Sequence, residues 1–190
     1  GGRDGTNLGM AIIREHLASK GLGLHCDLQN EHSIVANNIA LLLMLNYGSE
    51  EQKATWVEKL AAGDAMFAFG ITEPKHGSDA THMETVAHKT SNGWIIQGEK
   101  TWNSGIHSAP ADLIFARTSG KAGDADGITA FLVPTDSAGF KLEELLWTFN
   151  MPTDHGRVSL EKVRVPETSI LGTEGKGLQI VQHFFNENMF

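Results

Sequence analysis

The sequence is poor in cysteine, in positive charge and in long apolar runs, and each shortage excludes a class of protein. The single cysteine, Cys26, has no partner for an intrachain disulfide, which excludes a disulfide framework and favours a reducing compartment such as the cytoplasm. Only 15 lysines and arginines stand against 23 aspartates and glutamates, and the net charge of −8 argues against nucleic-acid binding through a basic surface. The longest apolar run, residues 39–45, is far shorter than the ~20 residues of a membrane-spanning helix. Together these features predict a soluble, mildly acidic, globular protein.

The two ends of the sequence lack features that are typical of natural termini. The chain begins without Met, and it stops at Phe190 inside a helical pattern, with no capping glycine, proline or polar tail. We therefore expect a piece of a longer protein, in which any targeting segment lies outside this sequence.

Residues 8–62 have the apolar spacing of helices. One helix is expected over residues 33–47, and the apolar run within it predicts burial on all sides. Ser49 and Gln52 have the spacing of a capping box, which predicts the start of the next helix, and Gly63 predicts its end.

Beyond residue 65 the apolar period shortens to two, as it does in strands. Six strand-like segments follow, at residues 66–71, 84–89, 94–97, 112–118, 128–133 and 158–165. Asn92-Gly93 predicts a hairpin turn, because both residues tolerate positive φ. Several short strands separated by turn signals favour an antiparallel barrel or sandwich, and helical spacing returns from residue 174. The predicted fold class is α+β, with an antiparallel β-barrel middle domain flanked by partial α-helical domains.

The densest polar cluster directly after a strand is residues 71–79, ITEPKHGSD. Gly77 allows a ligand to approach the backbone closely, Thr72 and Ser78 offer hydroxyls, and free amides in such a turn can bind an anion. An ordinary turn, in which Ser78 and Asp79 bond to nearby backbone groups, explains the same residues. Spacing alone favours the ordinary turn.

A second cluster, residues 100–105, reads KTWNSG. Trp102 could stack on a planar ring, with Ser104 donating a hydrogen bond to the edge of that ring. A core tryptophan with a satisfied N–H is the alternative, and by itself the pattern favours it.

The sequence contains nine histidines, and His76 and His82 lie close to Asp79. None of them forms the i, i+4 pair with a glutamate base that marks a zincin, and the one cysteine lies far away. We therefore predict no metal site and interpret these histidines as solvated or hydrogen-bonded surface residues.

Taken together, residues 70–79 resemble the first signature of the acyl-CoA dehydrogenase family, and residues 100–105 resemble its Lys-x-Trp-[Ile]-[Thr/Ser]-[Asn/Gly] segment. Later matches come in the family's order, at residues 128–134 (ITAFLVP), 138–140 (AGF), 163–166 (VRVP) and 171–177 (LGTEGKG). The resemblance spans nearly the whole chain. It implies the end of an N-terminal helical domain at 1–64, a middle β-barrel domain that binds flavin and acyl-CoA at 65–172, and the start of a C-terminal helical domain at 173–190.

The family desaturates an acyl-CoA thioester: a base takes the α proton, and the β hydrogen leaves as hydride to N5 of FAD. The resemblance implies that FAD is the cofactor and that it is bound by Phe69, Ile71, Thr72, Gly77, Ser78, Trp102, Asn103 and Ser104. In this interpretation Trp102 covers one flavin face, Ser104 lies beside N5, and Ser78 bonds the pyrophosphate. Ser78 also lies near the pantetheine arm of CoA, and Asn186 and Met189 are the other substrate-binding candidates.

The chain departs from the family pattern at several positions. Lys75 and His76 stand where small residues are usual, and we favour a solvent-facing His76. The family's Gly-x-Arg-x-Ser-x-Thr stretch is replaced by PTDHGR at residues 152–157. Met189 stands where many members have an arginine that helps to hold the acyl-CoA.

The base of the family is normally a glutamate in the C-terminal helical domain, most of which lies beyond residue 190. We therefore predict no catalytic residue within this chain, and we expect the chain alone to be inactive. The resemblance also implies an acyl-CoA substrate, an electron-transfer flavoprotein as acceptor, and a homodimer or homotetramer for the full-length protein. Two alternatives stay open. One is an acyl-CoA oxidase or other flavoenzyme on the same fold, and the other is a non-catalytic acyl-CoA-binding module.

Overall fold

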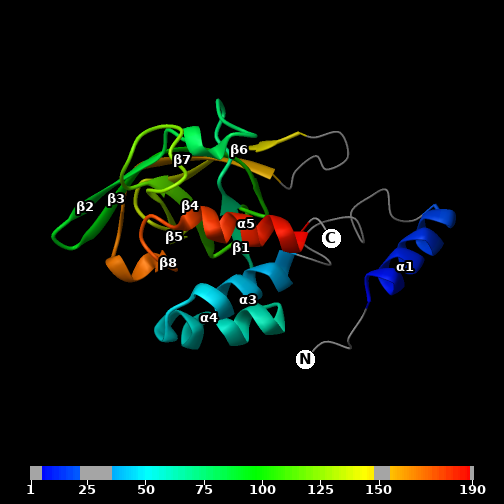
Figure 1. The fold of residues 1–190 in the computed structure, drawn as a ribbon. Coiled ribbons are helices and arrows are strands. Elements are labelled where there is room, and N and C mark those ends of the chain that lie inside the picture. The colour runs from blue at the N-terminus through cyan, green and yellow to red at the C-terminus, as the bar shows by residue number, and fades with distance from the viewer. Residues whose placement is uncertain (1–5, 22–35, 148–154, 189–190) are drawn as a thin grey trace.

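The computed structural model describes residues 6–21, 36–147 and 155–188 (Figure 1). The helices are α1 (Asn7–Ser19), α3 (Ala36–Tyr47), α4 (Glu50–Ala62) and α5 (Gly177–Asn188), with short 3-10 turns η1 (Ala80–His82) and η2 (Glu167–Ser169). Within these described ranges, every helix is too short or too polar to span a bilayer.

The start and end of α4 confirm the local signals in the sequence. The Ser49 side chain accepts a hydrogen bond from the Gln52 backbone, and the Gln52 side chain accepts one from the Ser49 backbone. Gly63 ends the helix with φ 81°, a left-handed conformation that glycine adopts without steric cost. The Gln52 amide also donates to the carbonyls of Thr168 and Ile170, which ties the start of this helix to a distant segment.

Burial of α3 is less complete than its apolar run predicts. Ile39, Leu43 and Met44 are buried in the core, whereas Leu42 and Leu45 are exposed. The helix packs against α4 on one side and α5 on another, so part of its surface has no neighbour among the described residues.

The strands are β1 (Phe67–Gly70), β2 (Val86–Thr90), β3 (Gly93–Ser104), β4 (Ala111–Arg117), β5 (Ile128–Pro134), β6 (Phe140–Leu146), β7 (His155–Val165) and β8 (Ile170–Leu171). They form one sheet in the order β6-β7-β3-β2-β4-β5-β8, and β1 pairs with β4. The predicted hairpin is confirmed, because β2 pairs with β3 and Thr90 lies opposite Gly93 across a two-residue turn.

The α+β class is confirmed, but the expected closure into a barrel is not found in the described part of the chain. The two outermost strands of the path, β6 and β8, pair with β7 and β5 and not with each other. The sheet is also not wholly antiparallel, since β4 runs parallel to both β1 and β2. Strand β6 has no counterpart among the predicted strands, because its residues are mostly exposed and show little apolar alternation.

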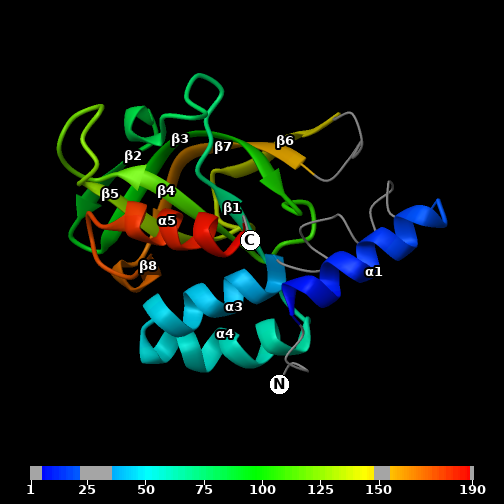
Figure 2. The ribbon, with the colours of Figure 1, turned by 45° about the vertical axis from the view of Figure 1, so that its right-hand side comes forward.

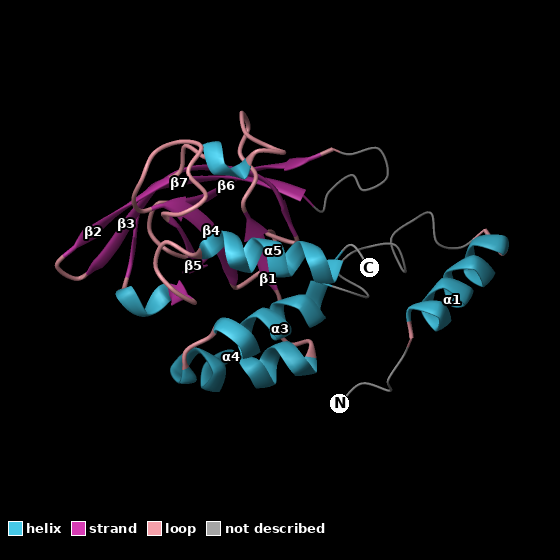
Figure 3. Cartoon of the chain, viewed as in Figure 1, coloured by secondary structure: helices cyan, strands magenta, loops and turns pink. Residues whose placement is uncertain are grey.

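The helices α3, α4 and α5 lie together on one side of the sheet (Figures 1 to 3). Figure 2 shows α5 running between the sheet and the α3–α4 pair, and α5 packs against both α3 and β5. The largest apolar cluster lies between this helical layer and strands β4 and β5. A second cluster lies within the sheet layer and includes Trp94, Phe131 and Val163. Phe67 and Phe69 of β1 pack against the first cluster, so this edge of the sheet lies against the helical layer.

Candidate functional site

A cavity of about 290 Å³ lies where β1, the end of β3 and the start of β7 meet α3 and α5. Its wall is formed by Ala40, Leu43, Met44, Phe67, Ala68, Phe69, Ile71, Thr72, Trp102, Ser104, Leu113, His155, Leu171, Phe184 and Phe185. Most of these side chains are apolar. The polar groups are the hydroxyls of Thr72 and Ser104, the His155 imidazole and the Trp102 indole N–H. Ligand sites in proteins typically combine an apolar wall with a few polar groups in this way.

Strand β3 turns two of its side chains into the cavity by means of an irregularity. Its pairing with β7 shifts register between Thr101 and Asn103, and Trp102 between them has φ 67°. A left-handed conformation is costly for a bulky residue and is usually retained where it aims a side chain. Trp102 and Ser104 line the cavity, and Trp102 remains 49% exposed.

Ser104 and His155 form the most direct polar contact in the cavity wall. The two residues lie opposite each other where β3 pairs with β7, and Ser104 Oγ is 2.7 Å from His155 Nδ1. The edge of the Trp102 ring also faces the His155 ring, with 6.2 Å between centroids. Trp102, Ser104 and His155 thus form one continuous part of the wall.

A second part of the wall comes from β1 and the residues that follow it. Phe69 stacks on Phe184 of α5 with ring centroids 3.9 Å apart, and its other contact is a tilted one with Phe115. Ile71 and Thr72 continue this wall, and the Thr72 carbonyl accepts a hydrogen bond from the Thr101 backbone. That bond ties the two walls together just before Trp102.

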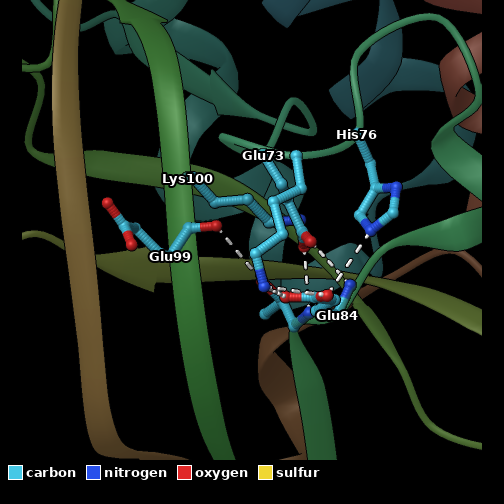
Figure 4. Close-up of polar contacts among 7 residues, drawn as sticks. Glu73, His76, Glu84, Glu99 and Lys100 are labelled. Carbon is cyan, nitrogen blue, oxygen red and sulfur yellow. Dashed lines mark hydrogen bonds and ion pairs between the residues drawn. The ribbon is translucent and has the colours of Figure 1, made fainter.

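Behind this wall lies a buried ion pair that the sequence analysis did not single out. Lys100 Nζ, fully buried, donates to Glu73 Oε1 at 2.8 Å and to the Ile71 carbonyl at 3.1 Å (Figure 4). Glu73 also accepts hydrogen bonds from the Glu84 and Thr85 backbone amides. Burial by itself raises the pKa of Glu73, but the charge and hydrogen bond of Lys100, together with the hydrogen bonds from Thr85 and Glu84, outweigh it and hold that pKa below its ordinary value. The pair fixes the start of the turn after β1.

The rest of that turn lies outside the cavity. Gly77 and Ser78 are exposed, and Asp79 accepts hydrogen bonds from the Thr81 backbone and the His82 ring, which holds η1. His76 is partly buried and lies 3.6 Å from Glu84, which also pairs with Lys75 (Figure 4). For Asp79 these contacts match the ordinary-turn interpretation. The described residues contain no group of three or more acidic, histidine or cysteine side chains suited to a metal ion.

Asn103 points to the side of β3 opposite Trp102 and Ser104. Its side chain is fully buried and donates a hydrogen bond to Asp112 of β4. Complete burial raises the pKa of Asp112 to about 7, although the Asn103 hydrogen bond and the charge of Lys100 oppose the shift. The Oδ1 atoms of both side chains lack a hydrogen-bond partner, and a proton on Asp112 would supply the donor that this pair lacks.

The structure therefore divides the predicted site residues into three groups. Phe69, Ile71, Thr72, Trp102 and Ser104 meet around the cavity, whereas Gly77, Ser78 and Asn103 do not line it. Asn186 is exposed on α5, where it accepts a hydrogen bond from Gln182, and Met189 lies outside the described residues.

Phe184 and His155 are among the lining residues that the sequence analysis did not single out. Phe184 belongs to the apolar stripe of a predicted helix, so nothing distinguished it from an ordinary core residue. His155 lies in the stretch where the chain departs from the family pattern, and that departure was the available signal.

Comparison with known proteins matches two family descriptions to this chain. The one described as "Acyl-CoA dehydrogenase, N-terminal domain" matches residues 1–64, and "Acyl-CoA dehydrogenase, middle domain" matches residues 68–163. The human mitochondrial short-chain specific acyl-CoA dehydrogenase is 36% identical over 149 residues, which is 77% of this chain and 35% of that protein. The glutaryl-CoA dehydrogenase of Desulfococcus multivorans is 35% identical over 181 residues, 95% of this chain and 45% of that protein.

A solved structure shows the same fold. The glutaryl-CoA dehydrogenase of Mycobacterium smegmatis in complex with FADH2 matches with a TM-score of 0.69 at 36% identity, over 78% of this chain and 37% of that one. In these three comparisons the chain spans between 35% and 45% of the relative's length. The sequence motifs, the matched domains and the shared fold agree, and the chain belongs to the acyl-CoA dehydrogenase family.

Proposed function

We propose that this chain forms the flavin side of the active site of an FAD-dependent acyl-CoA dehydrogenase, which desaturates an acyl-CoA thioester between Cα and Cβ. One observation carries the proposal: Phe69 of β1 and Thr72 just after it line a single, mainly apolar cavity together with Trp102 and Ser104 of β3. These residue types supply what a flavin ring requires, namely aromatic and aliphatic surfaces for its faces and hydroxyls for its polar edge. When bound, the flavin supplies the acceptor for the β hydride.

The chain's own residues would bind and orient the reactants. Trp102, half exposed at the cavity, would cover one ring face, and Ser104 would donate toward the ring edge, where negative charge grows during reduction. Thr72 and the backbone around Ile71 would bond the polar edge. Gly77 and Ser78, which lie in the exposed turn, would contact the pyrophosphate, and Asn103 would contribute through its backbone alone because its side chain bonds Asp112. Ser78, Asn186 and Met189 remain our candidates for the acyl-CoA.

The base that takes the α proton is proposed to lie outside this chain. No carboxylate lines the cavity among the described residues, and Glu73, the acidic residue next to the cavity wall, is buried against Lys100. We propose the domain boundaries 1–64, 65–172 and 173–190 given above, with the base in the remainder of the third domain. The chain by itself would then bind flavin without desaturating its substrate.

Flavin binding with two tryptophan variants tests the proposal. We expect the chain to perturb the visible absorption spectrum of added FAD, and Trp102→Ala to weaken binding by at least tenfold. Trp147→Ala is the matched control, because Trp147 is 80% exposed and does not line the cavity. An equal effect of the two substitutions, or an unchanged flavin spectrum with Trp102→Ala, would contradict the stacking role of Trp102.

Anaerobic addition of acyl-CoA substrates of several chain lengths to the full-length protein separates the alternatives. Bleaching of the flavin followed by transfer to electron-transfer flavoprotein supports the dehydrogenase. Rapid reoxidation by air with formation of peroxide indicates an oxidase. Tight acyl-CoA binding without bound flavin indicates a non-catalytic module, an interpretation that the absence of a carboxylate from the described cavity wall keeps open.

A further inference from the structure

We propose that His155 is a positioning residue that sets the direction of the Ser104 hydroxyl hydrogen, so that protonation of His155 turns this hydrogen into the cavity. The part of the proposal that concerns bound flavin rests on the proposed function, whereas the part that concerns the two side chains does not. His155 belongs to the stretch in which this chain departs from the family pattern, so its role cannot be carried over from that pattern.

The contact between the two residues is direct and well supported by the fold. Ser104 Oγ lies 2.7 Å from His155 Nδ1, and both residues line the cavity. Their backbones are paired in register where β3 meets β7, so the two side chains leave neighbouring strands side by side. The Trp102 ring edge lies against His155 as well, which limits the orientations available to the imidazole.

The direction of this hydrogen bond depends on the protons of the imidazole. A serine hydroxyl has one hydrogen to donate and two lone pairs to accept with. When His155 is neutral with its proton on Nε2, Nδ1 can only accept, so the hydroxyl hydrogen points at His155 and away from the cavity. When His155 is protonated, Nδ1 can only donate, so Ser104 accepts and its own hydrogen must find another partner.

The surroundings of Ser104 favour a hydroxyl hydrogen that points at neutral His155. His155 is the one hydrogen-bond partner that the described structure gives to the Ser104 hydroxyl. The cavity residues that α3 and α5 contribute are apolar, so they offer no competing side-chain acceptor. A hydroxyl in such a wall donates to the acceptor that is present, because an unsatisfied donor is costly. We therefore expect neutral His155 to carry its proton on Nε2.

The charged groups near His155 do not replace Ser104 as its partner. The strand register places Arg157 next on the same side of β7, with Glu144 of β6 opposite it, and Arg157 bonds both Glu144 and Glu99. Opposite His155 itself, β6 contributes Leu146. From α5, Phe184 and Phe185 share the cavity with His155. Among the described residues, no ion pair or carboxylate hydrogen bond therefore ties the imidazole to a charge.

The consequence for a bound flavin is a pH-dependent hydrogen-bond donor at the ring edge. When His155 is protonated, the Ser104 hydrogen is free to donate to an acceptor in the cavity. Such a donor stabilises the electron density that the ring gains on reduction. The reduction potential should therefore rise toward low pH through two contributions, the charge of the imidazolium and the released hydroxyl hydrogen. Only the second contribution requires Ser104.

The first test uses the chain without flavin and reads the ring nitrogens by NMR after ¹⁵N-histidine labelling. We expect Nδ1 of His155 to be unprotonated at high pH and protonated at low pH, and Ser104→Ala to shift both the Nδ1 resonance and the titration midpoint. A protonated Nδ1 at high pH, or a resonance and titration unchanged by Ser104→Ala, would overturn the switch. His155→Asn assigns the signal, and circular dichroism verifies that each variant is folded.

The second test measures the reduction potential of bound flavin between pH 5.5 and 8.5 in four proteins: wild type, His155→Asn, Ser104→Ala and the double variant. We expect the reduction potential of wild type to exceed that of His155→Asn by an amount that grows toward low pH. The same difference, measured between Ser104→Ala and the double variant, should be clearly smaller. An equal difference in both backgrounds would mean that charge alone acts, which overturns the hydroxyl mechanism. Failure of every protein to bind flavin would instead contradict the proposed function, and the NMR result would still decide the proton arrangement.

Discussion

The cavity wall and the buried polar network behind it use the same strand in opposite ways. On the cavity side, Trp102 and Ser104 are partly exposed, and the described structure shows one hydrogen bond from their side chains, to His155. On the buried side, Lys100 and Asn103 are fully enclosed and bonded to Glu73 and Asp112. The charged groups are thus committed to architecture, whereas neutral groups with spare hydrogen-bonding capacity face the cavity. We therefore expect the side chains of the proposed site to contribute little to stability.

The largest effect expected from breaking this contrast is that of Lys100→Met. Removing the cation leaves the Glu73 carboxylate buried without its partner, which should lower the free energy of unfolding by about 3–5 kcal/mol. Urea denaturation measures this. Lys89→Met is the matched control, because the Lys89 ion pairs with Glu167 and Glu174 are exposed and its loss should be small. Equal losses of stability in Lys100→Met and Lys89→Met would show that burial does not determine how much Lys100 contributes to stability.

Asp112 provides a pH-dependent test of the buried side. An unfolded aspartate releases its proton near pH ~3.9, whereas Asp112 in the folded chain holds it up to about 7. Between these values the folded state binds more protons, so stability should fall as pH rises, by up to about 1.4 kcal/mol per pH unit, and level off above the folded pKa. Asp112→Asn should remove this slope from urea-denaturation midpoints, and Asp136→Asn, at an exposed aspartate, should retain it. A slope that persists in Asp112→Asn would refute the assignment.

A smaller loss of stability is expected where β1 approaches the buried Asn103–Asp112 pair. A Cβ on Gly70 would lie 2.6 Å from Ile114 Cδ1 and 2.8 Å from Asn103 Nδ2, so Gly70→Ala should cost about 1–3 kcal/mol through crowding. Gly77→Ala is the control, since a Cβ there meets nothing within 4 Å. Thermal unfolding of the two variants measures the difference. Similar melting temperatures would mean that β1 can move away from the pair.

The smallest change in stability should come from the cavity side. Ser104→Ala removes one hydrogen bond in a partly open wall and should lower the free energy of unfolding by no more than about 1 kcal/mol. The same variant should weaken flavin binding, which fluorescence titration with FAD measures. A large loss of stability without an effect on flavin would reverse the proposed division between the two sides of the strand.

Local signals in the sequence were reliable because the physics that they report is local. The capping box at Ser49 and the left-handed Gly63 depend on a few neighbouring residues, and both ends of α4 agree with them. The motif grouped Asn103 with Trp102 and Ser104, but the irregularity of β3 at Trp102 leaves the Asn103 side chain buried against Asp112. No local signal in the sequence marked that irregularity.

Contacts between distant segments could not be predicted in this way. Ser104 and His155 are 51 positions apart, and their contact depends on the register between β3 and β7. The pairing of Lys100 with Glu73 likewise requires the turn after β1 to fold back over β3. The open sheet has the same origin, since closure depends on whether β6 and β8 meet, and no local pattern encodes that distance. Strand β6 was not predicted because its residues are mostly exposed and show little apolar alternation.

The two roles of Gln52 have a consequence for the order of folding. Its side-chain oxygen completes the capping box within a single turn of α4, while its side-chain nitrogen bonds carbonyls 116 and 118 positions further along the chain. The first contact can form as soon as the helix does, whereas the second must wait until the loop to η2 and β8 has closed. We therefore expect the two bonds to form at different times. Gln52→Glu keeps the capping oxygen and replaces the amide donor by a carboxylate oxygen that the two carbonyls repel, so it should accelerate unfolding while leaving the refolding rate nearly unchanged.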